Sequence, residues 1–100
     1  MIQSYRDKGT EVLHRGAQNA RERRLLNRYP QDILAMARRK LDLIDHAQDL
    51  ADLRVPPGNR LEALHGNLAG YFSIRINDQW RIIFRWIGSD AYDVTVVDYH

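Results

Sequence analysis

The stretch RLEALHGNLAGYFSIRINDQWRIIFRW, residues 60–86, decides the fold. In its second half, apolar and polar side chains alternate with a period of two, which is typical of strands in a half-buried sheet. Phe72, Ile74 and Ile76 alternate with polar neighbours, and the residues Asn-Asp-Gln then separate them from a second alternating run that begins at Trp80. The stretch therefore predicts an antiparallel hairpin.

The register of this hairpin follows from which side chains must share a face. A two-residue turn would place Arg81 on the same face as Ile74, where an unpaired guanidinium costs on the order of several kcal/mol. A three-residue loop at residues 77–79 instead pairs Arg75 with Arg81 and Ile74 with Ile82. We therefore expect the second register. It gives the sheet an apolar face toward the core and a basic face carrying Tyr71, Arg75, Arg81 and Arg85.

The chain before the hairpin has a strand pattern followed by helical patterns. Residues 1–5 alternate apolar and polar side chains, which predicts a brief first strand. Residues 7–15 predict a short helix that buries Val12 and Leu13. Residues 19–28 contain four arginines; a solvated helix face or a connector is favoured over a strip that tracks phosphates or binds a partner.

Pro30 begins the best-defined helix, because proline fits the first helical turn and Asp32 suits the positive end of the helix dipole. This helix is predicted to bury one apolar stripe. Its charged residues, including Lys40, are expected to face solvent. The stripe consists of Ile33, Ala37, Leu41 and Ile44, widened by Leu34 and Met36.

Residues 51–59, with two prolines and a glycine, predict a linker where helices end and strands begin. Residues 91–97 predict a last strand whose Val94 and Val96 face the core. An order of one strand, two or three helices and then a run of strands indicates an α+β fold rather than alternating α/β. With 100 residues and no internal repeat, we expect a single domain, residues 1–100.

The composition bears on the cellular location of the protein. The chain has no cysteine, so disulfides and thiolate chemistry are excluded, which suits a reducing cytoplasm. The start MIQSYRDKGTEV has no apolar signal region and the chain has no apolar run of spanning length. We therefore expect a cytoplasmic protein that neither crosses nor enters a membrane.

Charge is small overall but unevenly spread. Residues 1–50 contain ten Lys/Arg and seven Asp/Glu (+3), whereas residues 51–100 contain five and six (−1). Lys8 and Lys40 are the only lysines, so the basic groups are nearly all guanidinium forks, which suit phosphate contacts and stacking on bases. This is compatible with RNA binding, although many unrelated domains share it.

The residues of the sheet also contain the groups needed to cleave RNA. Transesterification requires a base for the 2′-OH, an acid for the leaving 5′-oxygen and cations for the charge that develops on the phosphate. Glu62 is the candidate base, His100 the candidate acid, and Arg81 with Arg75 or Arg60 the candidate phosphate contacts. A carboxylate and an imidazole can be oppositely protonated near neutral pH. The four histidines are scattered without metal-ligand spacing, so no metal site or cofactor is expected.

Each of these residues also has a structural interpretation. A glutamate flanked by arginines more often forms an ion pair, and arginines on an exposed strand face more often serve solubility. Chain ends such as His100 are often frayed. Tyr99 and Trp80 fit packing better than base stacking. On spacing alone, the sequence predicts a small α+β domain and leaves nucleic-acid binding open.

Three segments carry a family resemblance: MIQSYRDKG at the start, PPGNRLEALHGNLAGYFSIRINDQWRIIFRW at residues 56–86, and VVDYH at the end. Together they resemble the HigB group of RelE-superfamily toxins, and within it the GraT-like subgroup of plasmid-maintenance killer proteins. The match runs end to end and is dense over residues 56–86. It implies a microbial-ribonuclease-like fold, with a short first strand and two to three helices on one face of a four-stranded antiparallel sheet.

The resemblance also implies an activity and partners. The expected protein is the toxin of a type II toxin–antitoxin system, a ribosome-dependent mRNA endoribonuclease that uses 2′-OH attack and no cofactor. A HigA-type helix-turn-helix antitoxin is expected to neutralise it, and their complex to bind operator DNA. Two alternatives stay open: a catalytically weak protein of this fold that mainly binds the antitoxin, and a basic domain that associates with the ribosome and cleaves nothing.

Site residues follow from the resemblance position by position. Arg81, in QWRIIF, matches the phosphate-stabilising arginine of the superfamily. The terminal residues Asp98, Tyr99 and His100 match the DYH of HigB proteins, where the histidine and tyrosine belong to the active site. The segment ALHGNLAG matches a loop that presents basic residues to RNA. The expected RNA or phosphate contacts are Arg60, His65, Arg75 and Asp98.

The chain departs from the family pattern at the base. Some HigB proteins have histidine at the position of Glu62 and lysine at the position of His65. The related YoeB toxins have glutamate there, acting as general base in an E-x-L-x-x-N-L-x-G segment that residues 62–70 of this chain match. Glu62 is therefore preferred to His65 as the base.

Overall fold

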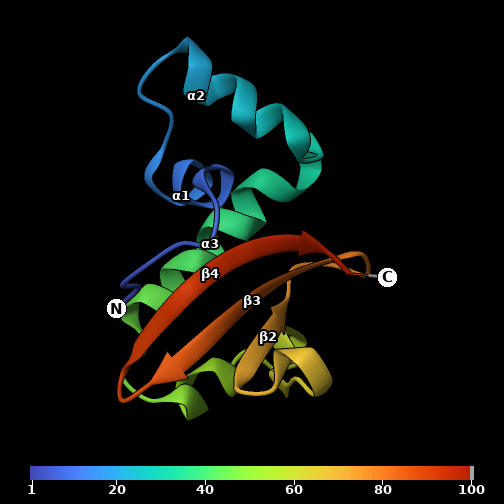
Figure 1. Cartoon of the computed structure of the whole chain (residues 1–100). Helices are drawn as coiled ribbons and strands as arrows, with labels where there is room; N and C mark the ends of the chain where they lie inside the picture. Colours follow the sequence, from blue (N-terminus) through green and yellow to red (C-terminus); the bar gives the residue numbers. More distant parts are fainter. Residues whose placement is uncertain (100) are drawn as a thin grey trace.

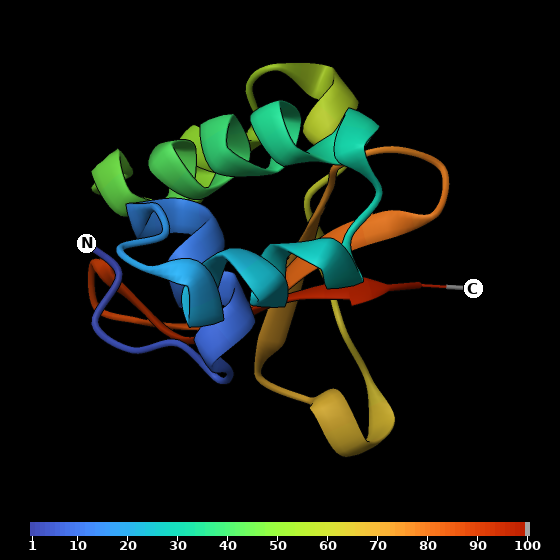
Figure 2. The same ribbon diagram turned by 90° about the horizontal axis from the view of Figure 1, so that it is seen from above.

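A computed structural model describes residues 1–99 of the chain, and His100 lies outside this description. The helices pack on one face of a four-stranded sheet of order β1-β2-β3-β4 (Figures 1 and 2). This confirms the predicted α+β fold. In chain order the elements are α1 (Lys8–Arg15), α2 (Ala20–Leu25), η1 (Leu26–Arg28), η2 (Gln31–Ile33), α3 (Leu34–His46), η3 (Leu50–Arg54), η4 (Pro57–Asn59), β1 (Glu62–Ala63), η5 (Gly66–Leu68), β2 (Tyr71–Arg75), β3 (Trp80–Ile87) and β4 (Asp90–Asp98), where η denotes a short 3₁₀ helix.

The hairpin of β2 and β3 has the predicted register. Ile74 pairs with Ile82, and Arg75 pairs with Arg81. Asn77 closes the loop between the strands, because its side-chain oxygen accepts hydrogen bonds from two backbone N–H groups, at 2.9 and 2.8 Å. All strand pairs in the sheet are antiparallel. The alternation of side chains then separates a core face from an open face, and the arginines lie on the open face.

The core lies between the sheet and the helices. Asp7 caps α1 by accepting a hydrogen bond from the backbone of Thr10 at 3.0 Å, and the helix buries Val12 and Leu13 as predicted. The predicted stripe of α3 is fully or almost fully buried, in contact with Ile74, Ile82 and Phe84 of the sheet. Its members are Ile33, Ala37, Leu41 and Ile44.

Two predictions about α3 were wrong. Met36 was expected to widen the buried stripe, but it is exposed. Lys40 was expected to face solvent, but it is buried, and its ammonium group donates a hydrogen bond to the side-chain oxygen of Asn59. The amphipathic pattern alone does not show this partner, because Asn59 comes from a segment that the sequence marks as a linker.

That linker prediction was also wrong. Residues 51–59 form most of η3 and all of η4, and they bury the side chains of Leu53 and Asn59. Prolines and a glycine do end the helical region here, but the segment packs against the body of the protein. Residues 50–60 are therefore a structural part of the domain that supports the sheet.

The predicted first strand is reduced to two parallel bridges. Ile2 pairs with Ala91 and Tyr5 with Val94, so residues 1–6 run along the outer edge of β4 (Figure 1). An irregularity in the β3–β4 register lies between Ile83 and Arg85. In β4, Val94 and Val96 face the core as predicted. Within residues 1–99, no helix combines the length and the apolar character needed to cross a bilayer.

Candidate active site on the open face of the sheet

Arg81 is the central cation of the open face, and it is far more buried than the predicted basic surface implied. Only 9% of the residue is exposed. Its Nε donates to the hydroxyl of Ser73 at 2.9 Å, and its Nη2 donates to the backbone carbonyl of Arg60 at 2.7 Å. Within residues 1–99, no hydrogen bond engages Nη1. The guanidinium is therefore held rigidly by neutral oxygens and retains a donor for a ligand.

Glu62 lies next to this guanidinium because of strand pairing. β1 pairs with β2 so that Glu62 is opposite Ser73, the residue that holds Arg81. The carboxylate oxygen is 4.0 Å from Nη2 of Arg81, and 56% of the glutamate side chain is exposed. At this distance the two charges attract without a close hydrogen bond, so the carboxylate remains accessible to a substrate.

Tyr99 completes the described part of the site. Its ring faces the guanidinium of Arg81, with 5.8 Å between the guanidinium carbon and the ring centroid. This geometry is a cation–π contact. The backbone N–H of Tyr99 donates to the carbonyl of Gln79 at 2.7 Å, which continues the pairing of β4 with β3 past Asp98. Spacing alone favoured a packing role for Tyr99, whereas the family resemblance placed it in the active site; 42% of the residue is exposed.

Glu62, His65 and Tyr99 line one pocket, which has a volume of about 620 Å³. The other walls are Ala63, Leu64 and Leu68, which belong to β1 and the η5 loop. Arg81 contacts two of the lining residues, Glu62 and Tyr99. The pocket thus brings a carboxylate, an imidazole and a phenol together beside a buried guanidinium, a set of groups that can bind a phosphate and move protons.

The other predicted RNA contacts are placed less directly. Arg75 is next to Arg81 in the sheet but its guanidinium bonds to Asp78 in the hairpin loop. Arg60 is exposed and takes part through its carbonyl, while Asp98 accepts a hydrogen bond from Gln79 at 2.9 Å. His100, the predicted acid, lies outside the described residues.

Ser73 is a site residue that the sequence analysis did not select. Its hydroxyl accepts the Nε–H of Arg81, and its side chain is fully buried. The signal was available, because Ser73 falls between Ile74 and Phe72 on the predicted arginine face. A small hydroxyl there leaves room for the guanidinium and supplies an acceptor.

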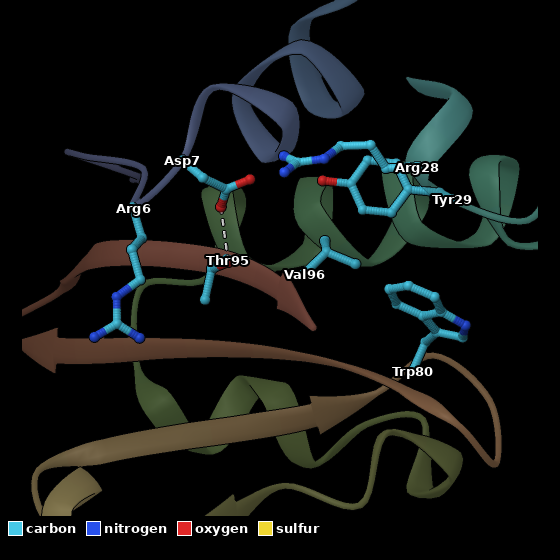
Figure 3. A pocket seen from close by; sticks show the side chains of 7 residues that line it. All are labelled: Arg6, Asp7, Arg28, Tyr29, Trp80, Thr95 and Val96. Carbon is cyan, nitrogen blue, oxygen red and sulfur yellow. Dashed lines mark hydrogen bonds between the residues drawn. The ribbon is translucent and has the colours of Figure 1, made fainter. Parts of the chain in front are cut away.

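A second pocket, of about 320 Å³, lies beside β4 and has a different character (Figure 3). The carboxylate of Asp7 is already used there, since it accepts from Thr10 and Thr95. Trp80 packs edge-on against Tyr29 at 5.8 Å between centroids, as expected for a packing residue. Burial raises the pKa of Tyr29, and the nearby Asp7 carboxylate adds to this rise. This pocket lies between the helical layer and β4, and its one lining carboxylate, that of Asp7, already accepts hydrogen bonds.

Comparison with known proteins shows the family of the chain. A family profile described as "RelE-like toxin of type II toxin-antitoxin system HigB" matches residues 3–100. The chain belongs to this family. It is therefore the toxin component of a type II toxin–antitoxin system, whose partner is an antitoxin. The RelE-like fold expected from the sequence is confirmed.

Two HigB relatives match over the whole chain. "Toxin HigB-1" of Vibrio cholerae serotype O1 (strain ATCC 39315 / El Tor Inaba N16961) is 41% identical over 100 residues, which cover 100% of this chain and 98% of that protein. "Endoribonuclease HigB" of Proteus vulgaris is 31% identical over 100 residues, covering 100% of both chains. A protein of Haemophilus influenzae (strain ATCC 51907 / DSM 11121 / KW20 / Rd) is 37% identical over 65 residues, 65% of this chain and 64% of that protein.

Proposed function

We propose that this HigB-family toxin cleaves mRNA on the ribosome, and that the pocket beside Arg81 is its active site. The protein is an endoribonuclease, as the name of its Proteus relative states for that protein. The observation that carries the proposal is the buried Arg81, fixed by Ser73 and the Arg60 carbonyl, with the exposed carboxylate of Glu62 at 4.0 Å. A rigid cation beside an available base suits an RNA phosphodiester.

The proposed reaction is an intramolecular transesterification. Glu62 takes the proton of the 2′-OH, whose oxygen attacks the adjacent phosphorus. The bond from phosphorus to the 5′-oxygen breaks, leaving a 2′,3′-cyclic phosphate, and His100 gives a proton to the departing 5′-oxygen. Arg81 binds the phosphate oxygens as their negative charge grows, and Tyr99 helps to hold the guanidinium in place through its cation–π contact.

Phosphates and bases next to the cleaved bond have further contacts available. His65 lines the pocket, and Arg60 and Arg75 lie next to the elements that form it. Arg75 bonds to an exposed aspartate of the hairpin loop, a contact that an RNA phosphate can replace at little cost. We assign His65 to RNA binding rather than to the base, because Glu62 is the acidic group closest to Arg81.

The proposed partners follow from the type II system. A HigA-type helix-turn-helix antitoxin neutralises the toxin, and the complex of the two binds operator DNA. The ribosome presents mRNA to the pocket. Coexpression with the antitoxin is expected to restore growth, and purified toxin is expected to cleave mRNA only when ribosomes are added. Equal cleavage of free mRNA would contradict the ribosome requirement.

Substitution of Arg81 tests the site. Induced expression of the wild-type chain is expected to arrest growth and to produce new mRNA 5′ ends, and Arg81→Ala is expected to abolish both. The control is Arg85→Ala on the same strand and face, because Arg85 bonds to Asp93 away from the pocket. New mRNA ends that persist in Arg81→Ala would refute the assignment of the site.

Removal of the last residue tests the acid. A chain ending at Tyr99 is expected to lose most cleavage while keeping antitoxin binding. Two other outcomes identify the alternatives. Growth arrest without new RNA ends indicates a protein that only binds the ribosome. Antitoxin binding with neither arrest nor cleavage in the wild-type chain indicates a catalytically weak protein that mainly serves as the antitoxin's partner.

A further inference from the structure

Lys40 is a buried lysine without an acidic partner. Only 8% of the residue is exposed, and within residues 1–99 no salt bridge includes it. Burial lowers the pKa of Lys40, and the positive charges of Arg39 and Arg75 lower it further. Burying an ammonium group without a counter-ion is unfavourable. The charge of Lys40 itself therefore does not stabilise the fold.

The hydrogen bond of Lys40 fixes a side chain that organises the segment before β1. Its ammonium group donates to the side-chain oxygen of Asn59, which is fully buried. The amide nitrogen of Asn59 in turn donates to the carbonyls of Leu53 at 3.1 Å and Val55 at 3.2 Å. Because the lysine takes the oxygen, the amide orientation is determined and its nitrogen faces the carbonyls.

Arg60, which follows Asn59 in the chain, connects this segment to the guanidinium of Arg81 through its backbone carbonyl. Arg60 has a backbone φ of 45° in the left-handed region, which is strained for a residue with a side chain. This conformation is maintained only if the surrounding structure determines it. Its carbonyl accepts from Nη2 of Arg81 at 2.7 Å. The strained residue therefore supplies the closest acceptor of Arg81 Nη2, which also donates to the Ser73 carbonyl at 3.4 Å.

We propose that Lys40 and Asn59 are positioning residues for Arg81. They act through the backbone of residues 59–60, which directs the Arg60 carbonyl at Nη2 of Arg81. This inference rests on the proposed function, since Arg81 must be the phosphate-binding group for its position to matter. Two elements that do not line the pocket, α3 and η4, would then help to position the catalytic guanidinium.

Lys40→Met tests the proposal, with Lys8→Met, the other lysine, as the matched control. The expected result is a fall in kcat of about tenfold or more, with little change in KM, because a misplaced cation weakens transition-state contacts more than substrate binding. The melting temperature is expected to change less than kcat, because Met removes a buried charge but leaves the Asn59 oxygen without its donor. Lys8 is an exposed residue that pairs with Glu11 and Glu22, so its variant is expected to keep the wild-type kcat.

Introducing Lys40→Met into the Arg81→Lys variant distinguishes an effect that acts through Arg81 from a general structural effect. If Lys40 acts through Arg81, adding Lys40→Met to Arg81→Lys is expected to cause no further loss of kcat. The Arg81 Nε–H signal in NMR, assigned by its absence in Arg81→Lys, is expected to shift in Lys40→Met and not in Lys8→Met. An unchanged kcat and signal in Lys40→Met, or the same loss in both backgrounds, would overturn the proposal.

Asn59→Ala removes the acceptor of the same hydrogen bond, and it tests the proposal if Lys40→Met does not fold. It is expected to lower kcat and to shift the Arg81 signal in the same way. The failure of the underlying function looks different: Arg81→Lys would then cleave as fast as the wild type. If only the positioning role of Lys40 and Asn59 is wrong, Arg81→Lys is impaired while Lys40→Met and Asn59→Ala cleave at the wild-type rate.

Discussion

At the scale of single residues, the side of the sheet was predictable but the degree of burial was not. The cost of an unpaired guanidinium among isoleucines places Arg81 on the open face, and the structure agrees. Its burial depends on three acceptors, the hydroxyl and carbonyl of Ser73 and the carbonyl of Arg60, and the last is a backbone group 21 residues away in the chain. No local sequence pattern reports such a contact.

Replacement of Glu62 by glutamine tests the base. Glu62→Gln keeps the shape but cannot accept a proton, so cleavage is expected to fall by about 10²–10⁴-fold. Stability is expected to change little, because 56% of the side chain is exposed and its pairing with Arg81 is long. Single-turnover cleavage and thermal unfolding measure the two effects. His65→Gln is the comparison variant; a larger loss there than in Glu62→Gln would reassign the base to His65.

The depressed pKa of Lys40 predicts how stability depends on pH. Between the folded pKa and the ordinary value of 10.5, the unfolded chain binds more protons, so the free energy of unfolding rises with pH in this window. Below the folded pKa, the full cost of the buried charge remains. The stability of Lys40→Met relative to the wild type is therefore expected to be greater at about pH 7 than at about pH 10.

Urea unfolding of both chains at the two pH values measures this margin. The difference between the variant and the wild type removes the contribution of groups common to both, including Tyr29, whose raised pKa acts in the alkaline range. Lys8→Met provides the baseline for losing an exposed lysine. A margin that widens with rising pH would show that the buried ammonium is stabilising, contrary to the expectation.

At the scale of elements, sequence patterns predicted those whose neighbours are local. The β2–β3 register and the α3 stripe follow from alternation and helical spacing, and both are confirmed. Residues 51–59 were taken for a linker because proline and glycine mark the end of a helix. The buried Leu53 and Asn59 show that such a segment can still be packed, which depends on tertiary contacts. The short β1 likewise depends on its pairing with β2.

Helix α2 is expected to be the first site of trypsin cleavage in the isolated toxin. None of its six residues is buried, so local opening costs little, and Arg21, Arg23 and Arg24 are exposed. Mass spectrometry of the earliest fragments identifies the cut. Replacing these three arginines by glutamine is expected to move the first cut elsewhere. Complete protection of this helix in the isolated toxin would contradict the prediction, and protection only with the antitoxin would indicate that the partner covers it.

At the scale of the whole molecule, one core unites the segments that form the site. The radius of gyration of 12.8 Å is close to the value of about 13 Å expected for a compact domain of this length. The same core cluster contains residues of α1, α3, η3 and three strands, so the two ends of the chain and the η3–η4 segment share one packing unit. The site combines β3 and β4, which belong to that unit, with β1, which is attached to it through its pairing with β2.

Thermal unfolding of the whole chain is therefore expected to be a single cooperative transition. Far-UV circular dichroism reports the helices and strands, while near-UV circular dichroism reports Trp80 and Trp86, which pack against Tyr29 and Phe84. The two signals are expected to coincide, with an enthalpy at the midpoint of about 60–80 kcal/mol. The short α2 contributes too little helix to separate them. A near-UV transition well below the far-UV one would show that the helices keep their structure after leaving the sheet, and that the core does not join the two layers.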